Sequence, residues 1–527
     1  MTPSDLSLSS LALPPWIAAV VPGAFAVGAV AVALDRGDPA RGWWTARGAA
    51  IAAALAAAAA AADVGGLGPA TLAQAVLLGL VTLLGVVLTR FSASYLAGEP
   101  GERRFAGWLL STLAGASFVL VTDDLLQLCL GWLATSLSLQ RLLTFYPDRP
   151  GALIAAREKF LVSRAADLCM TIAAVLLGTG LGTLSLGGIG EVAAAGELPA
   201  TARVAMAFVA VAALLKCAQL PVQRWLLGIM EAPTPVSALL HAGVVNLGGF
   251  VLIRLGPALV QAPVAQWLLV VFGGTTAAFA ALAVGAQSSI KRTLAWSTCA
   301  QMGFLMVQCG LGAFEMALLH LVAHSAYKAH AFLAAGSSVA RNAALAGLPP
   351  RATVPTPGRL LFSAVTGLAL VAAAFGLVMP HGFGDPAAVV GGLVVAIALA
   401  ALFANGDPAA GGGVRRGAAA LLMLGTWVLL HDLLRASMGL PTHSGASWWL
   451  ALGALLAMAP LPLLRSLQWL RPQHPWVPAL RVFCQRGAFV GPWFTAVALR
   501  TWRVPPLDHS SARSPDLSSA LRLRGDS

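Results

Sequence analysis

The stretch from Ala313 to Ala335 decides the fold and reads AFEMALLHLVAHSAYKAHAFLAA. Small and apolar residues fill a length that can span a bilayer as one helix, but His320, His324 and Lys328 interrupt it. Residues spaced by four project from one helix face, here within about 80°. Because a buried ionisable row costs free energy unless it meets partners or a polar cavity, we interpret the row as functional. The alternative is that these side chains lie at a helix end and extend to water.

The composition indicates a membrane protein. The chain has 527 residues, of which 58% are hydrophobic and 10% charged, and its mean hydropathy is +0.80. Ordinary soluble domains carry about 25% charged residues. Apolar runs recur from Pro14 to about Pro460, separated by short loops. We therefore predict an all-α polytopic membrane protein. The run from Trp16 to Leu34 lacks the basic start of a cleaved signal, so we expect it to be retained.

The basic residues predict the orientation in the membrane. The net charge is +12, and the basic residues favour loops and the tail, which suits a negatively charged cytoplasmic leaflet rather than nucleic acid. Arg36, Arg41 and Arg47 follow the first apolar run, whereas only Asp5 precedes it, so we expect the N-terminus outside. We expect a cytoplasmic C-terminus because the tail carries Arg471, Arg481, Arg486, Arg500, Arg503, Arg513, Arg522 and Arg524. An outside start and an inside finish require an odd number of spans, and we predict about 13 transmembrane helices.

The cysteines and short motifs give no sign of redox or ATP chemistry in this chain. The six cysteines are scattered, without a CxxC or an iron–sulfur spacing, and we expect them to be small core residues. They are Cys129, Cys169, Cys217, Cys299, Cys309 and Cys484. The sequence contains no P-loop, no HExxH, no haem motif and no GxGxxG after a strand. We therefore expect a transporter subunit rather than an enzyme, with no cofactor in this chain.

Lysine is scarce and lies in or near apolar segments. Of the 33 basic residues only Lys159, Lys216, Lys291 and Lys328 are lysines. Arginine stays protonated everywhere, whereas a buried lysine can exchange a proton. Lys216 lies well inside the apolar run that contains Pro221, and proline breaks a helix. Transporters place such broken helices beside charges at their mid-membrane sites.

The titratable residues at membrane depth form a spaced series that could pass a proton or Na⁺. Its members are Lys216, His241, His320, His324 and Lys328, with candidate acidic partners Glu231, Asp167 and Asp124. Arg164 could equally hold Asp167 in a structural ion pair. Asp124 is more simply explained as a residue at a turn or helix N-terminus. Lys291, next to Arg292, could be a loop residue that only sets topology.

Four segments, in order, resemble the antiporter-like, proton-translocating subunits of respiratory complex I and the Mrp antiporters. They are KCAQLPVQRWL from Lys216, EAPTPVSALLHA from Glu231, IKRTLAWST from Ile290, and the helix with His320, His324 and Lys328. The resemblance covers about residues 70 to 340. It implies an antiporter-like fold with broken helices and Lys216 as the central channel lysine. It also implies that His320, His324 and Lys328 continue the proton relay. It also implies that His241 and Lys291 are associated positions and that Arg164 and Asp167 match an Arg-x-x-Asp pattern.

Several positions depart from that family. Where the family has Gly-Trp-Glu, with the acid partnering the channel lysine, this chain has Gly131, Trp132 and Leu133. The Asp that precedes Ile-Lys-Arg in the family is Ser289 here. The second half has no lysine where the family places its terminal channel residue, and we expect no room after the bundle for a long lateral helix. We do not expect complete complex I function, and Asp124, Asp167 or Glu231 would have to replace the missing acid.

These departures, with TSLSLQRLLTFYPDRP at 135–150 and REKFLVSR at 157–164, resemble the membrane subunit of the DAB inorganic-carbon transporters. The resemblance implies a large peripheral, zinc-binding, DabA-like subunit on the cytoplasmic side, similar to a β-carbonic anhydrase. Ion flow through this chain would then drive CO₂ hydration to bicarbonate by that partner, which would hold the zinc. The cytoplasmic loops and the basic tail would be the docking surface.

Two other functions stay open, an Mrp-like cation/proton antiporter subunit and a proton-pumping subunit of a complex I-like redox complex. In each case we expect a multi-pass protein of a bacterial inner membrane. We divide the chain into N-terminal transmembrane helices (1–69), an antiporter-like core (70–345), C-terminal transmembrane helices (346–465) and an amphipathic, basic tail (466–527).

Overall fold

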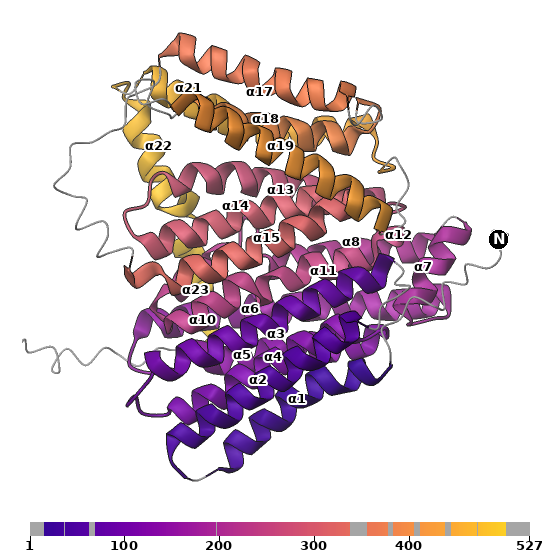
Figure 1. Cartoon of the computed structure of the whole chain (residues 1–527), viewed down its shortest axis with the longest axis vertical. Coiled ribbons are helices and arrows are strands. Elements are labelled where there is room, and N and C mark those ends of the chain that lie inside the picture. The colour runs from indigo at the N-terminus through magenta and orange to yellow at the C-terminus, as the bar shows by residue number, and fades with distance from the viewer. Residues whose placement is uncertain are drawn as a thin grey trace, which may run out of the picture.

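The chain folds almost entirely into α-helices. The computed structural model describes residues 15–35, 37–62, 69–196, 198–337, 356–377, 383–404, 412–437, 444–471 and 473–501. Long helices run side by side through this part of the chain, with no β-strand among the described residues (Figure 1). The prediction of an all-α fold is confirmed. Asp5, Arg36 and the tail residues from Arg503 onward lie outside these ranges.

The helices form three consecutive groups. The N-terminal group is α1 (Pro15–Leu34), α2 (Pro39–Ala62), α3 (Pro69–Tyr95) and α4 (Glu102–Val121). The middle group is α5 (Leu125–Leu143), α6 (Pro150–Leu181), α7 (Leu186–Ala195), α8 (Ala200–Lys216), α9 (Arg224–Gly228), α10 (Thr234–Ala242), α11 (Leu247–Arg254), α12 (Gly256–Leu259), α13 (Pro263–Val284), α14 (Ile290–Gly310) and α15 (Phe314–Leu333). The C-terminal group is α17 (Pro357–Leu377), α18 (Pro386–Ala404), α19 (Gly412–Ser437), α20 (Trp448–Met458), α21 (Pro460–Leu470), α22 (Trp476–Gln485) and α23 (Val490–Thr501).

One continuous hydrophobic core joins the first two groups. It runs from Ile17 in α1 to Phe332 in α15. The helices α17, α18 and α19 bury a smaller core of their own around Phe375 and Leu399. A third cluster, around Val307 and Val390, packs α18 and α20 against α13 and α14. The buried ionisable residues of the middle group, such as Lys216 and Lys328, are therefore enclosed by helices on both sides.

Eleven helical segments in the described part of the chain are long and apolar enough to cross a membrane. The helices α5, α8, α14 and α15 run in the same bundle (Figure 1) but fall outside that count. Among them, α15 contains Glu315, Lys328 and three histidines, and α14 begins with Lys291 and Arg292. The polytopic architecture is confirmed, whereas the number 13 and the orientation stay predictions.

Two helices of the bundle are broken, one near Pro221, as the sequence predicts, and one at a turn that contains no proline. The helix α8 ends at Lys216, and α9 starts only at Arg224. Pro221 cannot donate a hydrogen bond, and side chains occupy the neighbouring backbone groups: Leu220 N donates to Thr276 Oγ1 (3.0 Å) and Gln219 Nε2 donates to the Cys217 carbonyl (2.7 Å). A 3₁₀ turn over Val244–Asn246 separates α10 from α11.

The amphipathic stretch after Ser466 forms two short helices. At 1.5 Å per residue, α22 and α23 are each too short to cross a core of about 30 Å. Figure 1 shows α22 at a steep angle to the long helices. Gln485 Nε2 donates to the Ala286 carbonyl after α13 (2.9 Å), and Thr495 of α23 contacts α6 and α9.

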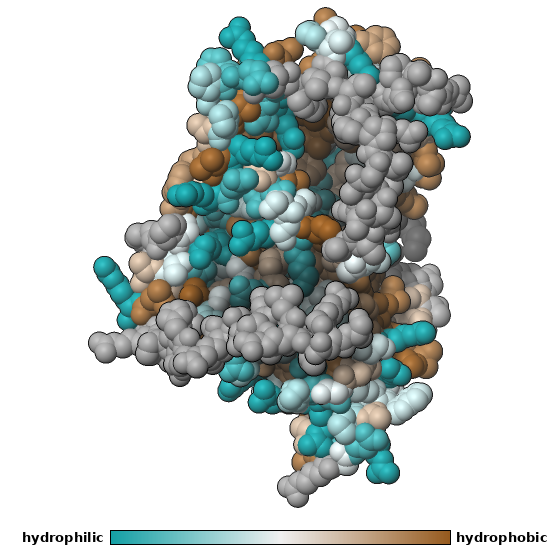
Figure 2. Space-filling model, turned by 90° about the vertical axis from the view of Figure 1, so that its left-hand side faces the viewer, coloured by the Kyte–Doolittle hydropathy of each residue, from teal (hydrophilic) through white to brown (hydrophobic). Residues whose placement is uncertain are grey.

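The two ends of the bundle differ in charge. Arginines at the starts of α2, α4, α14, α17 and α19 gather at one end, and Figure 2 shows hydrophilic residues across it. These include Arg41, Arg103, Arg104, Arg292, Arg359 and Arg415. The opposite end carries Asp123, Asp124 and Asp385, with Arg254 and Arg435 paired to carboxylates there.

Candidate ion pathway

Lys216 lies in the interior at the break between α8 and α9. Only 5% of the residue is exposed, and its Nζ has no hydrogen-bond acceptor among the described residues. The ring of Trp132, from α5, lies beneath the amine with its centroid 4.4 Å from Nζ. A cation over an indole face is stabilised by the ring quadrupole. The residue that opens the resemblance to the antiporter-like subunits is thus a buried amine without a fixed acceptor.

Of the three candidate acids, Asp167 is the one that lies near Lys216. It belongs to α6, pairs with Arg164 (Nη2 to Oδ2, 2.7 Å) and is within electrostatic reach of Lys216. The ion pair with Arg164 and the electrostatic interaction with the lysine therefore occur together. Sequence reasoning had left them as alternatives.

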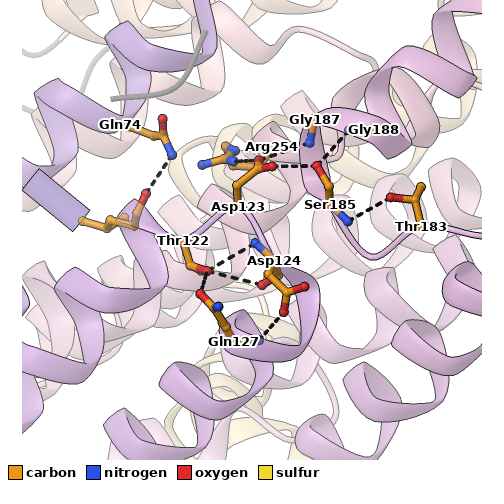
Figure 3. Close-up of polar contacts among 11 residues, drawn as sticks. Gln74, Thr122, Asp123, Asp124, Gln127, Thr183, Ser185, Gly187, Gly188 and Arg254 are labelled. Atoms are coloured by element: carbon orange, nitrogen blue, oxygen red, sulfur yellow. Dashed lines mark hydrogen bonds and ion pairs between the residues drawn. The ribbon is translucent and has the colours of Figure 1, made fainter. Parts of the chain in front are cut away.

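Asp124 and Glu231 lie elsewhere. Asp124 caps α5, where its Oδ1 accepts a hydrogen bond from Gln127 N (2.9 Å; Figure 3). Glu231 is exposed, its carboxylate lies against Gly151 in the first turn of α6, and its carbonyl accepts from Arg149 (2.9 Å). Both positions suit a carboxylate at a helix N-terminus.

Asp123 ties the α4–α5 turn to α7 and α11. Its Oδ1 pairs with Arg254 Nη2 (3.0 Å) and accepts from Gly187 N (3.1 Å), while Oδ2 accepts from Ser185 Oγ (2.6 Å; Figure 3). A β-bridge between Asp124 and Ser185 completes the junction. These contacts explain Asp123 and Asp124 as structural residues at one end of the bundle.

The structure adds Lys159, which sequence reasoning noted for its rarity but did not place in the pathway. Lys159 of α6 is 3% exposed, and its Nζ donates to the carbonyl (2.6 Å) and Oγ (3.1 Å) of Ser136 in α5. It is within electrostatic reach of Lys216, Arg164 and Asp167. We call these four residues the amine cluster. Lys159, Ser163 and Asp167 are spaced by four residues, and this spacing is the sequence signal that could have linked Lys159 to Asp167.

A second group, the imidazole cluster, consists of His241 from α10 and His320, His324 and Lys328 from α15. His241 is fully buried, with Nδ1 3.0 Å from Thr298 Oγ1 and its ring stacked on Phe332. Lys328 is also fully buried and donates to the Leu294 carbonyl (3.1 Å). Lys328 is within electrostatic reach of His241 and His324. The residues that the sequence predicts as one row do gather, and the break after α10 brings His241 to them.

His324 sits between two acceptors. Its Nδ1 is 2.5 Å from Gln301 Oε1, and its Nε2 is 3.0 Å from the His241 carbonyl. A doubly protonated ring donates to both. A neutral ring keeps the Nε2 donor and can accept at Nδ1 from the same glutamine once its amide turns over. Gln301 therefore accommodates either protonation state of His324. His320, 2.9 Å from Gln308 Oε1, has the same kind of partner.

The two helix breaks meet between the clusters. The Cys217 thiol, just after α8, donates to the Val245 carbonyl in the 3₁₀ turn (3.2 Å). Asn246 Nδ2 donates to the Ala242 carbonyl (2.9 Å) and to Ser325 Oγ (2.7 Å). No hydrogen bond or ion pair described here joins the two clusters directly, so water would have to bridge them. Lys291 lies outside both clusters and donates to Thr234 Oγ1 (3.1 Å).

A third buried group, which sequence reasoning missed, joins α15 to the C-terminal helices. Glu315 Oε1 is 3.4 Å from His431 Nδ1, and Arg435 Nη2 is 3.2 Å from Asp385 Oδ2. Asp385 Oδ1 also accepts from Ser444 Oγ (2.6 Å). These partners are far apart in the sequence, so no local spacing could predict the contacts between them. Within the described residues, no group of three or more His, Cys, Asp or Glu side chains could hold a metal ion.

Comparison with known proteins gives consistent relatives. A family model described as "NADH:quinone oxidoreductase/Mrp antiporter, TM" matches residues 122–349. The chain is similar to the probable inorganic carbon transporter subunit DabB of Hydrogenovibrio crunogenus, with 37% identity over 81% of this chain and 82% of that protein. It is 36% identical to DabB2 of Halothiobacillus neapolitanus, over 81% of this chain and 79% of the relative.

More distant relatives share the middle of the chain or the fold. NADH-quinone oxidoreductase subunit L of Escherichia coli is 34% identical over 50% of this chain and 43% of its own length. Among solved structures, the Mrp complex of Dietzia sp. DQ12-45-1b matches 96% of this chain and 58% of that chain, with 25% identity and a TM-score of 0.53. A chain of an archaeal membrane-bound sulfane sulfur reductase shares the fold, with 17% identity and a TM-score of 0.55 over 92% of this chain.

Proposed function

This chain belongs to the family of DabB inorganic carbon transporter subunits, and on that premise we propose that it carries protons across the membrane to energise inorganic carbon uptake. It is a multi-pass bacterial membrane protein and a transporter subunit. The observation that carries the proposal is the pair of buried clusters of amines and imidazoles at the two helix breaks. Such groups are costly in a membrane unless they serve a function.

The chemistry of the imidazole cluster favours H⁺ over Na⁺. A sodium ion, like other hard cations, needs several oxygen ligands and a compensating charge. The imidazole cluster offers an ammonium and three imidazoles but no carboxylate. Amines and imidazoles near neutrality instead bind and release protons. The side-chain amides of Gln301 and Gln308 then accept or donate as the rings change state.

The charge of the bundle ends supports the expected orientation. Basic residues accumulate on the cytoplasmic side of membrane proteins, so the arginine-rich end of Figure 2 would face the cytoplasm. The peripheral, zinc-binding, DabA-like partner would dock there. Hydration of CO₂ releases one proton for each bicarbonate formed, and proton flow through this chain would supply the free energy that keeps hydration running towards bicarbonate.

Two measurements test the proposal. The full chain is purified in mild detergent from cells that also produce its neighbours in the assembly, and the co-purifying proteins are identified. A large zinc protein is expected. Several small membrane subunits would instead indicate an Mrp-like antiporter, and flavin or iron–sulfur proteins a redox complex.

The purified complex is then reconstituted into vesicles that contain a pH-sensitive dye. A proton gradient should be dissipated by the wild-type complex and by Glu191→Gln, which removes an exposed charge from α7, at the end opposite the proposed docking surface. It should persist with Lys216→Met. Equal dissipation by the Lys216 variant, once insertion is verified, contradicts the proposal.

A further inference from the structure

We propose that Lys159 is a second proton-carrying amine of the pathway and that it shares one proton with Lys216 beside Asp167. The inference rests on the proposed function, since it assigns a further residue to the same site. It concerns the four groups of the amine cluster, which come from the neighbouring helices α6 and α8, with α5 covering them.

The geometry places Lys159 and Lys216 on two helices that pack against each other. Lys159, Ser163 and Asp167 follow one another at four-residue intervals on α6, so they project from one face within about 80°. That helix packs closely against α8, which ends at Lys216. Both lysines are nearly fully buried, at 3% and 5% exposure. The row on α6 thus has the same spacing as the row on α15 that decided the fold.

The charges of the cluster cannot all be balanced. With both lysines protonated, Lys159, Lys216 and Arg164 contribute three positive charges against one carboxylate, that of Asp167. The guanidinium stays charged and already pairs with Asp167 (2.7 Å). Two ammonium groups in one buried site therefore disfavour each other. Protonation of one amine therefore opposes protonation of the other. Two sites that hold one proton between them can pass that proton from one to the other.

The other charged groups close to Lys159 compensate each other. The adjacent Glu158 is buried and accepts at Oε1 from Arg224 Nε (3.0 Å) and Thr495 Oγ1 (2.7 Å). Its carboxylate is therefore occupied by α9 and α23 and is not a free counter-ion for the amine cluster. On the α5 side the Lys159 amine donates both of its hydrogen bonds among the described residues to Ser136, which carries no charge.

The choice of lysine also fits a group that must lose its charge. Only four of the 33 basic residues are lysines, and an arginine could donate to Ser136 as well as a lysine does. Arginine cannot release its proton in a protein. In the proposed step the ammonium of one lysine breaks an N–H bond, the free amine of the other forms one, and Asp167 or a water relays the proton. The cluster has the same charge before and after the step.

Flux measurements with Lys159→Met and Lys159→Arg test the assignment. If Lys159 carries protons, the Met variant loses the amine and the Arg variant holds a permanent charge, so both should lower proton flux in vesicles about tenfold or more. Near-normal flux with Arg would show that the position needs only a fixed donor, and normal flux with Met would show that it needs none. Either result overturns the inference while wild-type flux still upholds the proposed function. Absence of flux in the wild type would instead refute the proposed function.

A titration of the lysine amines gives a readout that does not depend on transport. Lysine labelled with ¹⁵N at Nζ should give few signals because the chain has only four lysines. Single Lys→Arg variants assign them. Replacing Lys216 with Met should let Lys159 stay protonated to a pH about one unit higher, because a neighbouring positive charge is gone. An unchanged titration of Lys159 would show that the two amines are independent and would overturn the inference.

Discussion

The amine cluster and the imidazole cluster both surround a buried amine, but the groups around that amine differ in charge. Around Lys216 the partners are charged: Arg164, Asp167 and a second lysine, with an indole ring below the amine. Around Lys328 they are neutral: the Leu294 carbonyl, imidazoles and the amides that contact them. The first cluster has a carboxylate and the second, as described above, has none.

This difference indicates that the two clusters have different roles in proton transport. A carboxylate beside an amine stabilises the protonated form, so the amine cluster can hold a charge at membrane depth. Rings that are hydrogen-bonded to amides and carbonyls can change tautomer, so the imidazole cluster can pass a proton on without storing it. Variants that remove the stored charge should therefore have larger effects than variants that remove one of several rings or donors.

Loss of the Lys216 amine should have the largest effect. Lys216→Met keeps the apolar stem but removes the charge over Trp132 and a positive charge that acts on Asp167. We expect proton flux to fall on the order of 100-fold, the scale of losing a positioned acid–base group. Dye-reported flux in vesicles measures this, with Glu191→Gln as the control for an exposed charge. If Lys216→Met loses less flux than Lys328→Met, the comparison is reversed and charge is held in the second cluster.

Loss of the Lys328 amine should be less severe. Lys328→Met removes a donor to the Leu294 carbonyl, but His241, His320 and His324 remain in contact with polar partners. We expect a decrease on the order of tenfold. The double variant Lys328→Met with His324→Ala should lose flux far more than the single one, because the ring between two acceptors is then gone as well. Equal flux in the single and double variants would show that His324 is not on the pathway.

The sequence could predict the elements but not their partners. The helices, the break at Pro221 and the row on α15 follow from apolar runs, a proline and a four-residue spacing, which are local signals. The break at Val244–Asn246 contains no proline and has no such signal. The choice among Asp124, Asp167 and Glu231 is a tertiary fact, because each lies near a helix end or an arginine in the sequence. Lys159 meets Lys216 only through the packing of α6 on α8. Glu315 meets His431 only because the C-terminal helices pack against α15.

Removal of the Asp167 charge should lower proton flux to an intermediate degree, and a second substitution should restore much of that flux. Asp167→Asn leaves Arg164 without its ion pair and weakens the protonated state of Lys216, so we expect flux to fall about fivefold. The half-buried Leu133 follows Trp132 in α5, at the position where the resemblance to the antiporter-like subunits implies a glutamate. Leu133→Glu in the Asp167→Asn background should return much of the flux in the same vesicle measurement. A double variant as slow as Asp167→Asn would show that position 133 does not reach the amine cluster.

The smallest effect on transport is expected at Asp124, the acid that caps α5. Asparagine caps a helix as well as aspartate does, so Asp124→Asn should keep both wild-type flux and thermal stability. Asp124→Ala loses the acceptor for Gln127 N, which should cost about 1 kcal/mol of unfolding free energy and lower the Tm by about 2 °C, again with wild-type flux. Thermal unfolding in detergent and vesicle flux, measured on the same preparations, separate the two effects. A large loss of flux in Asp124→Asn would mean that the charge of Asp124 itself acts in transport. Asp167 would then not be the only acid that supports the pathway, and the contrast between a charged amine cluster and a neutral imidazole cluster would no longer hold.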